Sequence, residues 1–148
     1  MNFLVEGLQG SGKSTLVNRL AALYPACSAY REGDYSPIEL AWCAYVDGAQ
    51  YRAILEKYPE LREQIERKTV REGERFIVCC TKIRTDNRGF YRDLEQYEIY
   101  NGRVPWDFFQ ALLLRRYAAW REDGTISECA LFQNTVEEML LFVSCMFK

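Results

Sequence analysis

Residues 7–14, Gly7-Leu8-Gln9-Gly10-Ser11-Gly12-Lys13-Ser14, join a short apolar stretch to an amphipathic one and so set how the chain begins to fold. The preceding residues 2–6 are rich in β-forming side chains and predict a short buried strand. The following residues 13–23 place leucines at helical spacing and predict a helix that Pro25 ends. The sequence therefore predicts a strand, a glycine-rich turn and a helix in immediate succession.

This turn has the spacing G-x-x-x-x-G-K-[ST], which suits the binding of a polyphosphate. Glycines allow backbone conformations closed to other residues, so successive amides can converge on phosphate oxygens at the positive end of a helix. The Lys13 ammonium would reach the β- and γ-phosphates, and the Ser14 hydroxyl would be a ligand of Mg²⁺. The alternative is a turn that only joins a strand to a helix. The predicted phosphate-binding residues are Gly7, Gly10, Ser11, Gly12, Lys13, Ser14 and Thr15.

The composition is that of a globular domain: 148 residues, 49% hydrophobic and 27% charged, with a formal net charge of -2. This charge argues against nucleic acid as a partner, and no apolar stretch approaches the roughly 18 residues of a membrane-spanning helix. The amino terminus lacks a basic region followed by an apolar run, so we expect no secretory signal. There is no histidine, and any proton transfer would therefore use a carboxylate, lysine, tyrosine or cysteine.

The cysteines favour a reducing compartment. None of the six forms a Cys-x-x-Cys pair, and Cys79 and Cys80 are adjacent, which suits neither a zinc site nor a compact disulfide framework. We therefore expect buried, reduced thiols and a cytoplasmic protein.

Helices alternate with short strands, which favours an α/β fold with a mainly parallel sheet flanked by helices. Ser36-Pro37 and Asp47 are expected to begin two helices, and Asn134 with Glu137 forms a predicted capping box. The prediction is a single domain over residues 1–148, with a helical insertion at about 37–122 between the second and third core strands. Further strands are predicted at 27–31, 75–82 and 125–132, and further helices at 36–42, 47–58, 59–73, 92–97, 105–122 and from 134 onward.

The glycine-rich loop and its context resemble the Walker A motif of the P-loop nucleoside triphosphate hydrolase superfamily. The resemblance implies a three-layer P-loop fold. A GTPase would carry Asn/Thr-Lys-x-Asp, but Thr81-Lys82-Ile83-Arg84 has arginine where aspartate must read guanine. Motor and transporter ATPases usually end a strand in aliphatic residues followed by aspartate, and the chain has no such run. The small-molecule kinase branch remains.

Two further segments are similar to thymidylate- and nucleoside-kinase-like enzymes. Residues 30–37 resemble the Arg-Glu segment that faces the phosphate acceptor in those kinases, although Gly33 replaces the usual proline. Residues 126–129 resemble the strand that carries an acid near the magnesium ion, although Cys129 replaces the usual arginine. Both segments would end at the carboxyl edge of a parallel sheet, where such sheets bind ligands.

The resemblance implies that Lys13, Asp34 and Glu128 are catalytic. Phosphoryl transfer depends on positioning and charge, so one carboxylate orients the acceptor and another holds the metal. Asp34 or Glu32 would serve the acceptor side, and Glu128 with Ser14 would serve Mg²⁺. Asp34 could instead cap the helix expected at Ser36, and Glu32 could be a surface acid. The arginines that could neutralise the transferred phosphate are Arg31, Arg88, Arg92, Arg115 and Arg116, of which the last two could instead form a solvated helix face.

The carboxyl-terminal side is short for this branch, whose members add two strands, a lid and an adenine-binding loop after the third strand. We therefore expect a kinase that is reduced or truncated there, in which the apolar residues 139–143 could form a homodimer. Truncation would impair turnover more than nucleotide binding, because phosphate binding is local and lid closure is not.

The predicted function is binding of ATP with Mg²⁺ and transfer of a phosphoryl group to a small hydroxyl or phosphate acceptor, such as a nucleoside or nucleotide. One alternative is a non-catalytic or truncated nucleotide-binding module. Another is sulfotransfer from a phosphosulfate donor, which usually needs a histidine or a second phosphate site. The sequence leaves open the acceptor and the choice between ATP and GTP.

Overall fold

The computed structural model describes residues 1–146, with side chains as far as Ser144. These residues form two compact units. The first unit contains Met1–Glu32, Ser36–Glu39 and the chain from Tyr100 onward. The second contains Gly33–Tyr35 and Leu40–Ile99. None of the helices in residues 1–146 has the length and apolar character that crossing a bilayer requires.

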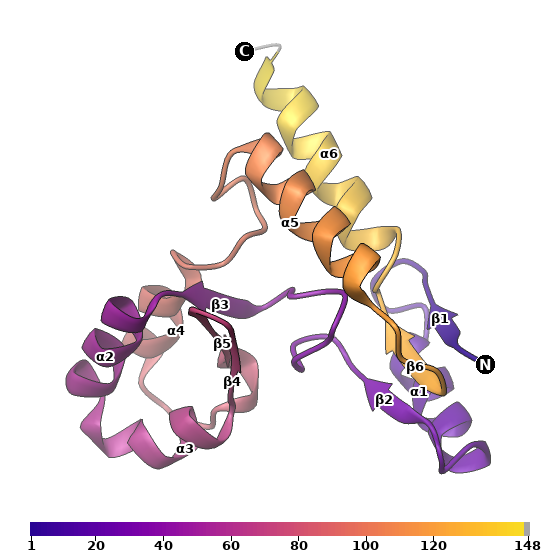
Figure 1. Cartoon of the computed structure of the whole chain (residues 1–148), viewed down its shortest axis with the longest axis horizontal. Helices are drawn as coiled ribbons and strands as arrows, with labels where there is room; N and C mark the ends of the chain where they lie inside the picture. The colour runs from indigo at the N-terminus through magenta and orange to yellow at the C-terminus, as the bar shows by residue number, and fades with distance from the viewer. Residues whose placement is uncertain (147–148) are drawn as a thin grey trace. The chain divides into compact units, whose positions relative to one another are not determined.

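A three-stranded parallel sheet forms the centre of the first unit (Figure 1). Its middle strand is β6 (Thr125–Glu128), which pairs on one side with β1 (Phe3–Val5) and on the other with β2 (Ser28–Tyr30). Every residue of β6 is buried, as is typical of parallel strands covered on both faces. The chain is therefore a small α/β protein with a parallel sheet and helices, as predicted.

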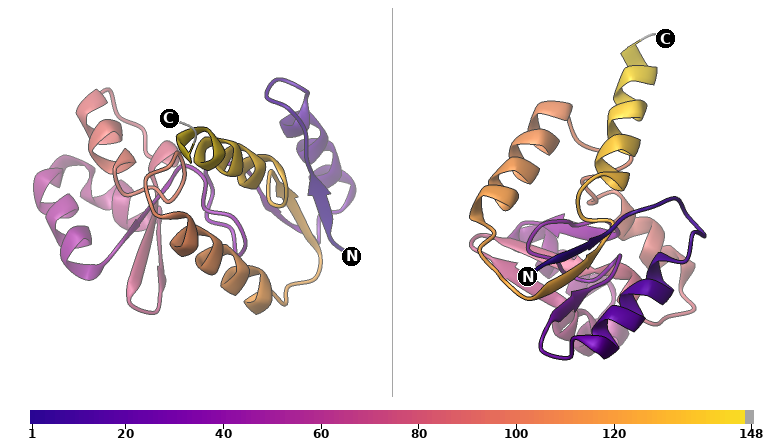
Figure 2. Two further views of the ribbon diagram at one scale, coloured as in Figure 1. Left: turned by 90° about the horizontal axis from the view of Figure 1, so that it is seen from above. Right: turned by 90° about the vertical axis from the view of Figure 1, so that its right-hand side faces the viewer.

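The helix α1 (Lys13–Leu23) runs alongside this sheet, as Figure 2 shows. Its fully buried Val17 packs with Val5 of β1 and Ile126 of β6. Burying a side chain of this size contributes roughly 1.5–3 kcal/mol to the free energy of folding. Because this small core joins α1 to β1 and β6, it also fixes the position of the loop between β1 and α1.

The first unit also contains two 14-residue helices, α5 (Trp106–Ala119) and α6 (Gln133–Met146), which are joined by an aromatic contact (Figure 1). The rings of Trp106 and Phe142 are 5.3 Å apart between centroids. The buried carboxylate of Glu138 on α6 accepts hydrogen bonds from the backbone amides of Asn101 (2.7 Å) and Gly102 (2.8 Å). This carboxylate ties the loop before α5 to α6.

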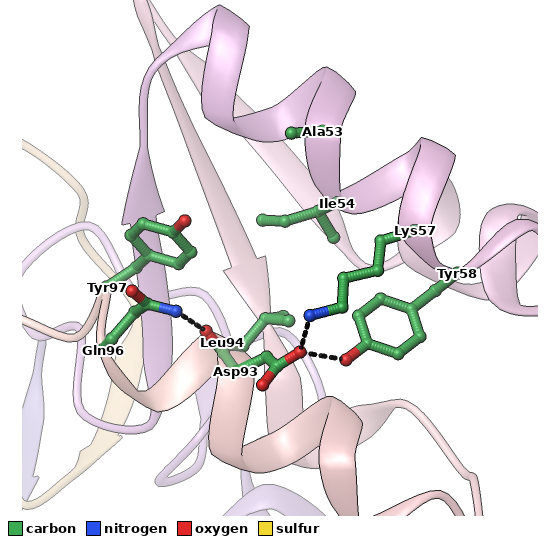
Figure 3. A pocket seen from close by; sticks show the side chains of 8 residues that line it. All are labelled: Ala53, Ile54, Lys57, Tyr58, Asp93, Leu94, Gln96 and Tyr97. Atoms are coloured by element: carbon green, nitrogen blue, oxygen red, sulfur yellow. Dashed lines mark hydrogen bonds and ion pairs between the residues drawn. The ribbon is translucent and has the colours of Figure 1, made fainter.

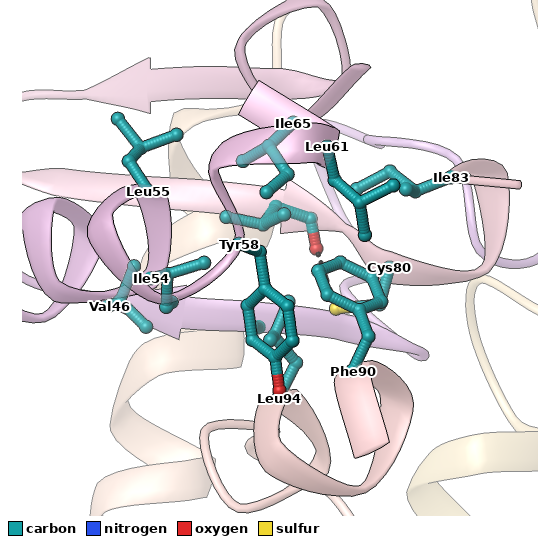
Figure 4. Packing of buried hydrophobic residues seen from close by; sticks show 12 residues of the cluster. Val46, Ile54, Leu55, Tyr58, Leu61, Ile65, Cys80, Ile83, Phe90 and Leu94 are labelled. Carbon is teal, nitrogen blue, oxygen red and sulfur yellow. Dashed lines mark hydrogen bonds between the residues drawn. The ribbon is translucent and has the colours of Figure 1, made fainter. Parts of the chain in front are cut away.

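The second unit contains an antiparallel sheet in the order β3-β5-β4, formed by Cys43–Val46, Arg75–Cys79 and Thr69–Glu72. Its helices supply much of a buried apolar cluster that includes Ile54, Phe90 and Leu94 (Figure 4). The helical segments are α2 (Gly48–Lys57), the 3₁₀ turn η1 (Pro59–Leu61), α3 (Arg62–Arg67), the 3₁₀ turn η2 (Cys80–Lys82) and α4 (Arg88–Glu95).

Several predicted helices and strands form where their local signals place them. The helix α1 has the predicted bounds, and the carboxylate of Asp47 caps α2 by accepting from the amides of Ala49 and Gln50 at 2.9 Å. The Gln50 side chain completes the capping box by accepting from the Asp47 amide. Strong caps and regular leucine spacing are therefore sufficient to fix these two helices.

The helix predicted at 36–42 is wrong. The Ser36 hydroxyl accepts from the amides of Ile38 (3.2 Å) and Glu39 (3.3 Å), as it would at a helix start, but the chain turns instead of continuing. Trp42 has a left-handed φ of 61° and leads into β3, a strand the sequence did not predict. Side-chain bonds from serine to nearby amides support turns as well as helix starts, and here the turn prevails.

Two other helix boundaries are also corrected. The helix predicted to extend to Gly73 ends at Arg67, and residues 69–72 form β4 instead. Asn134 does not begin α6, because the helix already includes Gln133. The predicted helical insertion at 37–122 thus contains three strands as well as helices.

We expect Phe90→Ala to lower the free energy of unfolding by about 3–5 kcal/mol, because it leaves a cavity in the apolar cluster of the second unit. The Phe90 side chain is fully buried and meets the ring of Tyr58 edge-on at 5.1 Å. The measurement is chemical denaturation followed by circular dichroism. The control is Phe132→Ala, whose side chain is 62% exposed and whose loss should change stability by less than about 0.5 kcal/mol. Equal effects of the two substitutions would contradict this assignment of the core.

Candidate functional site

The glycine-rich loop between β1 and α1 depends on backbone conformations that favour glycine. Gly10 and Gly12 have φ of 79° and 88°, in the left-handed region. Gly7 has φ of 151°, and a β-carbon there would lie 2.9 Å from the Ser11 hydroxyl oxygen. A β-carbon on Gly10 or Gly12 would meet no atom within 4 Å, and residues 8–12 are exposed. The loop therefore keeps its backbone open to an approaching ligand.

Lys13 lies beneath this loop with its side chain turned back across it. The residue is 9% exposed, and its ammonium donates to the carbonyl oxygens of Gly7 (2.8 Å) and Leu8 (3.0 Å). An ammonium has three N–H donors, so one of them has no partner among the described residues. A positive charge is thus held at the base of the loop with a hydrogen available for an anion.

The amino terminus of α1 has no acidic residue of its own. Gly12 occupies the position before the helix and makes no side-chain hydrogen bond, and the first turn contains no acid. In residues 1–146, α1 is the only α-helix with neither a side-chain acceptor at its start nor an acid in its first turn. No acid within α1 itself therefore compensates the partial positive charge of this helix end.

Ser14 and Glu128 meet beside the loop although 114 positions separate them in sequence. The Ser14 hydroxyl donates to Oε1 of Glu128 at 2.7 Å. Glu128 is 6% exposed, ends β6 and lies opposite Val5 in the parallel register. Because β6 is next to β1, the sheet itself places this carboxylate at the first turn of α1. The two residues predicted to hold Mg²⁺ are thus hydrogen-bonded to each other.

Glu6 is a residue of this region that the sequence did not single out. It follows β1 directly, and its carboxylate accepts from the amides of Leu131 (2.8 Å), Phe132 (3.3 Å) and Gln133 (3.1 Å) at the start of α6. The partners lie about 125 residues away, so no local pattern could have revealed the contact. Glu6 caps α6 in place of the capping box that was predicted at Asn134.

The residue after Glu128 turns the chain sharply toward α6. Cys129 has a left-handed φ of 57°, and its amide donates to the Val5 carbonyl at 3.0 Å. Burial, followed by the nearby charge of Glu32, raises the pKa of the Cys129 thiol to about 12, although the Lys13 ammonium opposes this. Cys129 therefore stays a neutral thiol near neutral pH and positions Glu128 rather than acting as a nucleophile.

The acids predicted for the acceptor side belong to different units. Glu32 is half-buried at the end of the first segment of the first unit. Asp34 belongs to the second unit, where its carboxylate forms an ion pair with the Lys82 ammonium at 3.3 Å. The alternative in which Asp34 caps a helix at Ser36 is wrong, because the structure has no helix there.

Two of the candidate arginines have defined structural contacts in the first unit. Arg31 donates through Nη2 (2.8 Å) to the Asn18 side-chain oxygen on α1, so it links the end of β2 to that helix. Arg116 is 5% exposed and donates to the backbone carbonyls of Ser36 and Ile38. The interpretation of Arg115 and Arg116 as a solvated face is therefore wrong for Arg116. Arg88 and Arg92 lie on α4 of the second unit.

A pocket of the second unit is lined by residues of α2 and α4 and by Gln96 and Tyr97 after α4 (Figure 3). Three of its polar side chains are paired with one another, since Asp93 accepts from the Lys57 ammonium and from the Tyr58 hydroxyl. Burial, and then the hydrogen bond to Asp93, raises the pKa of Tyr58 to about 12. A neutral phenol and a satisfied ion pair indicate a structural contact between the helices.

Within residues 1–146 no cluster of three or more histidine, cysteine, aspartate or glutamate side chains could hold a metal ion. Comparisons with protein-family models, with curated proteins and with solved structures give no match to this chain. The geometry around the glycine-rich loop is therefore the feature from which a function can be inferred.

We expect Glu6→Ala to lower the free energy of unfolding by about 1–2 kcal/mol, as loss of a good helix cap does, because three amides at the start of α6 lose their acceptor. Denaturant unfolding measures the change. Glu137→Ala, which removes an exposed acid from α6 itself, should alter stability by less than about 0.5 kcal/mol. The capping role is refuted if both variants are equally stable.

The Tyr58 phenol should make stability fall at alkaline pH. Its pKa is about 12 in the folded chain and 10.0 ordinarily, so the folded state holds this proton more tightly. The resulting stabilisation is complete below pH 10 and is lost as the pH rises through 12. Tyr58→Phe has no such proton, so its unfolding free energy should decrease less than that of the unaltered chain across this range. Identical decreases in denaturation series at several pH values would disprove the role of Tyr58.

Proposed function

We propose that this chain binds a nucleoside triphosphate, ATP, together with Mg²⁺ and that it is a phosphotransferase of the P-loop small-molecule kinase type. The observation that carries the proposal is the hydrogen bond between Ser14 and Glu128 beside an uncapped helix start. A hydroxyl and a carboxylate, next to exposed glycines and a buried ammonium, are the groups that a magnesium–polyphosphate complex requires.

The residues around the loop suit a polyphosphate. The exposed backbone of residues 8–12 and the amino terminus of α1 offer amide donors and a positive dipole. Lys13 adds a full charge with one unpartnered N–H. In this proposal Gly7, Gly10 and Gly12 shape the loop, while Ser11, Ser14 and Thr15 add hydroxyl groups.

Ser14 and Glu128 are suited to Mg²⁺ because this ion prefers oxygen ligands. In nucleotide sites Mg²⁺ uses one or two protein oxygens and completes its coordination with phosphate oxygens and water. A cluster of three acidic side chains is therefore not required. When bound, the ion would neutralise the phosphate charge, and the hydrogen bond between Ser14 and Glu128 holds both oxygens in place for it.

Transfer to an acceptor requires a further carboxylate, for which we propose Asp34. A kinase that acts on a small hydroxyl or phosphate acceptor, such as a nucleoside or nucleotide, is the function we favour. The alternative is nucleotide binding without turnover. That alternative is supported by the fact that Lys13, Ser14 and Glu128 all lie in the first unit whereas Asp34 lies in the second.

Location and assembly are part of the same proposal. No disulfide joins the five cysteines whose side chains are described, which supports a cytoplasmic location. The side chains of Val136, Met139, Leu140 and Val143 on α6 are each 46–61% exposed, which supports a homodimer formed through this helix.

We expect Lys13→Ala to weaken binding of Mg-ATP by about 10- to 100-fold, because hydrogen bonds to charged groups contribute roughly 1.5–3 kcal/mol. Ser14→Ala should weaken it mainly when Mg²⁺ is present. Isothermal titration calorimetry with and without Mg²⁺ measures both effects. Arg19→Ala removes an exposed positive charge from the same helix and serves as the control, with binding unchanged.

The same preparations distinguish a kinase from a binding module. Incubation with Mg-ATP and a panel of nucleosides and nucleotides should yield a phosphorylated product, and Asp34→Asn should reduce its formation without changing ATP affinity. Binding without any product would favour the non-catalytic alternative. If Lys13→Ala bound ATP as tightly as the unaltered chain, the proposed phosphate site would be wrong.

A further inference from the structure

Cys43 and Cys79 face each other across the antiparallel sheet of the second unit. Cys43 is the first residue of β3 and Cys79 the last of β5, and the two are direct partners in the register. The Cys43 amide donates to Leu40 (3.1 Å) and the Cys79 amide to Lys68 (2.9 Å), so neither amide bonds across the pair. Partners of this kind have α-carbons about 4.5 Å apart. Disulfides span roughly 4.4–6.8 Å between α-carbons, so the backbone can accommodate one here.

The thiols of this pair differ in their chemistry from their neighbour Cys80. A hydrogen bond from the Cys43 thiol lowers the pKa of Cys79, although burial opposes the shift. Burial instead raises the pKa of Cys80 to about 12, and its thiol donates to the Val78 carbonyl at 3.3 Å. Cys79 is therefore the better nucleophile, Cys43 is the thiol positioned to react with it, and Cys80 is inert.

We propose that Cys43 and Cys79 are a redox-active dithiol that hydrogen peroxide converts into a disulfide within the chain. The Cys79 thiolate attacks one peroxide oxygen, the O–O bond breaks, and a sulfenic acid and hydroxide form. The Cys43 sulfur then attacks the Cys79 sulfur and water leaves. Together two thiols and one peroxide give one disulfide and two waters, so the sulfurs are oxidised and the peroxide is reduced.

The position of the pair at the end of the sheet gives a small oxidant access. Cys43 and Cys79 are 0% and 5% exposed, so a bulky disulfide reagent would be excluded from the closed structure. However, β3 is an edge strand, and the pair borders an irregular segment in which Trp42 is 46% exposed. Strand ends beside such segments open at lower free energy than the sheet interior. We therefore expect peroxide to react slowly but selectively.

Oxidation would also remove contacts of the segment that carries Asp34. The Cys43 sulfur lies 3.8 Å from the carbonyl oxygens of both Gly33 and Asp34. The one proton of the Cys43 thiol can be donated to the Cys79 sulfur or to one of these oxygens, whereas a disulfide sulfur has no proton to donate. The redox proposal does not depend on nucleotide binding, because its readout is the covalent state of two sulfurs.

The test is treatment of the folded full chain with hydrogen peroxide, followed by alkylation of the remaining thiols in denaturant and peptide mapping by mass spectrometry. The expected result is one cross-linked peptide pair containing Cys43 and Cys79, about 2 Da lighter than the two reduced peptides together. A reducing agent should restore both thiols. Oxidation in denaturant, where the sheet is absent, should lose the selectivity for this pair.

Cysteine variants test which two thiols form the cross-link. Cys80→Ser should form the cross-link as the unaltered chain does, whereas Cys43→Ala and Cys79→Ala should not form it. Peptide mapping of the unaltered chain decides the matter even where a variant fails to fold. The proposal is overturned if peroxide instead joins Cys79 to Cys80, produces a cross-link between chains, or converts Cys79 to its sulfinic acid while Cys43 stays alkylatable.

Discussion

The structure around the glycine-rich loop depends on the insertion of β6 between β1 and β2. This one strand gives β1 its partner, buries Ile126 against α1 and ends with Glu128 next to the Ser14 hydroxyl. Parallel pairing presents the carboxyl ends of all three strands at one edge, where the loop also begins. A register slip of one residue would turn Glu128 to the opposite face of the sheet, so register and proposed chemistry are linked.

The helices differ in which groups bind the amides at their amino termini, where the helix dipole places a partial positive charge. The amides at the start of α2 are bound by Asp47, and those at the start of α6 are bound by Glu6, which comes from another part of the chain. The start of α1 has glycine before it and an ammonium beneath it, and the nearby Glu128 carboxylate accepts from the Ser14 hydroxyl. The absence of a side-chain cap at this helix start supports the proposed binding of an external anion.

The sequence predicts those features whose causes are local. The bounds of α1, the capping box at Asp47 and the turn glycines all follow from residues within a few positions of one another. The role of Glu6 could not be predicted, because its hydrogen-bond partners lie about 125 residues away in the sequence. The strand at Cys43 was missed because the Ser36-Pro37 signal for a helix start is equally compatible with a turn. Glu128 was predicted to be a magnesium ligand because of its place on a strand, but only the sheet order shows that its carboxylate reaches the Ser14 hydroxyl.

The sheet order also determines when the proposed site can exist during synthesis. The strand that pairs with β1 is β6, so the first strand emerges from the ribosome long before its neighbour has been translated. The second unit, completed at Ile99, can fold while β6 is still untranslated. Until residues 125–128 appear, the nascent amino-terminal segment lacks the strand that pairs with β1 and the Ile126 side chain that packs with Val5 and Val17.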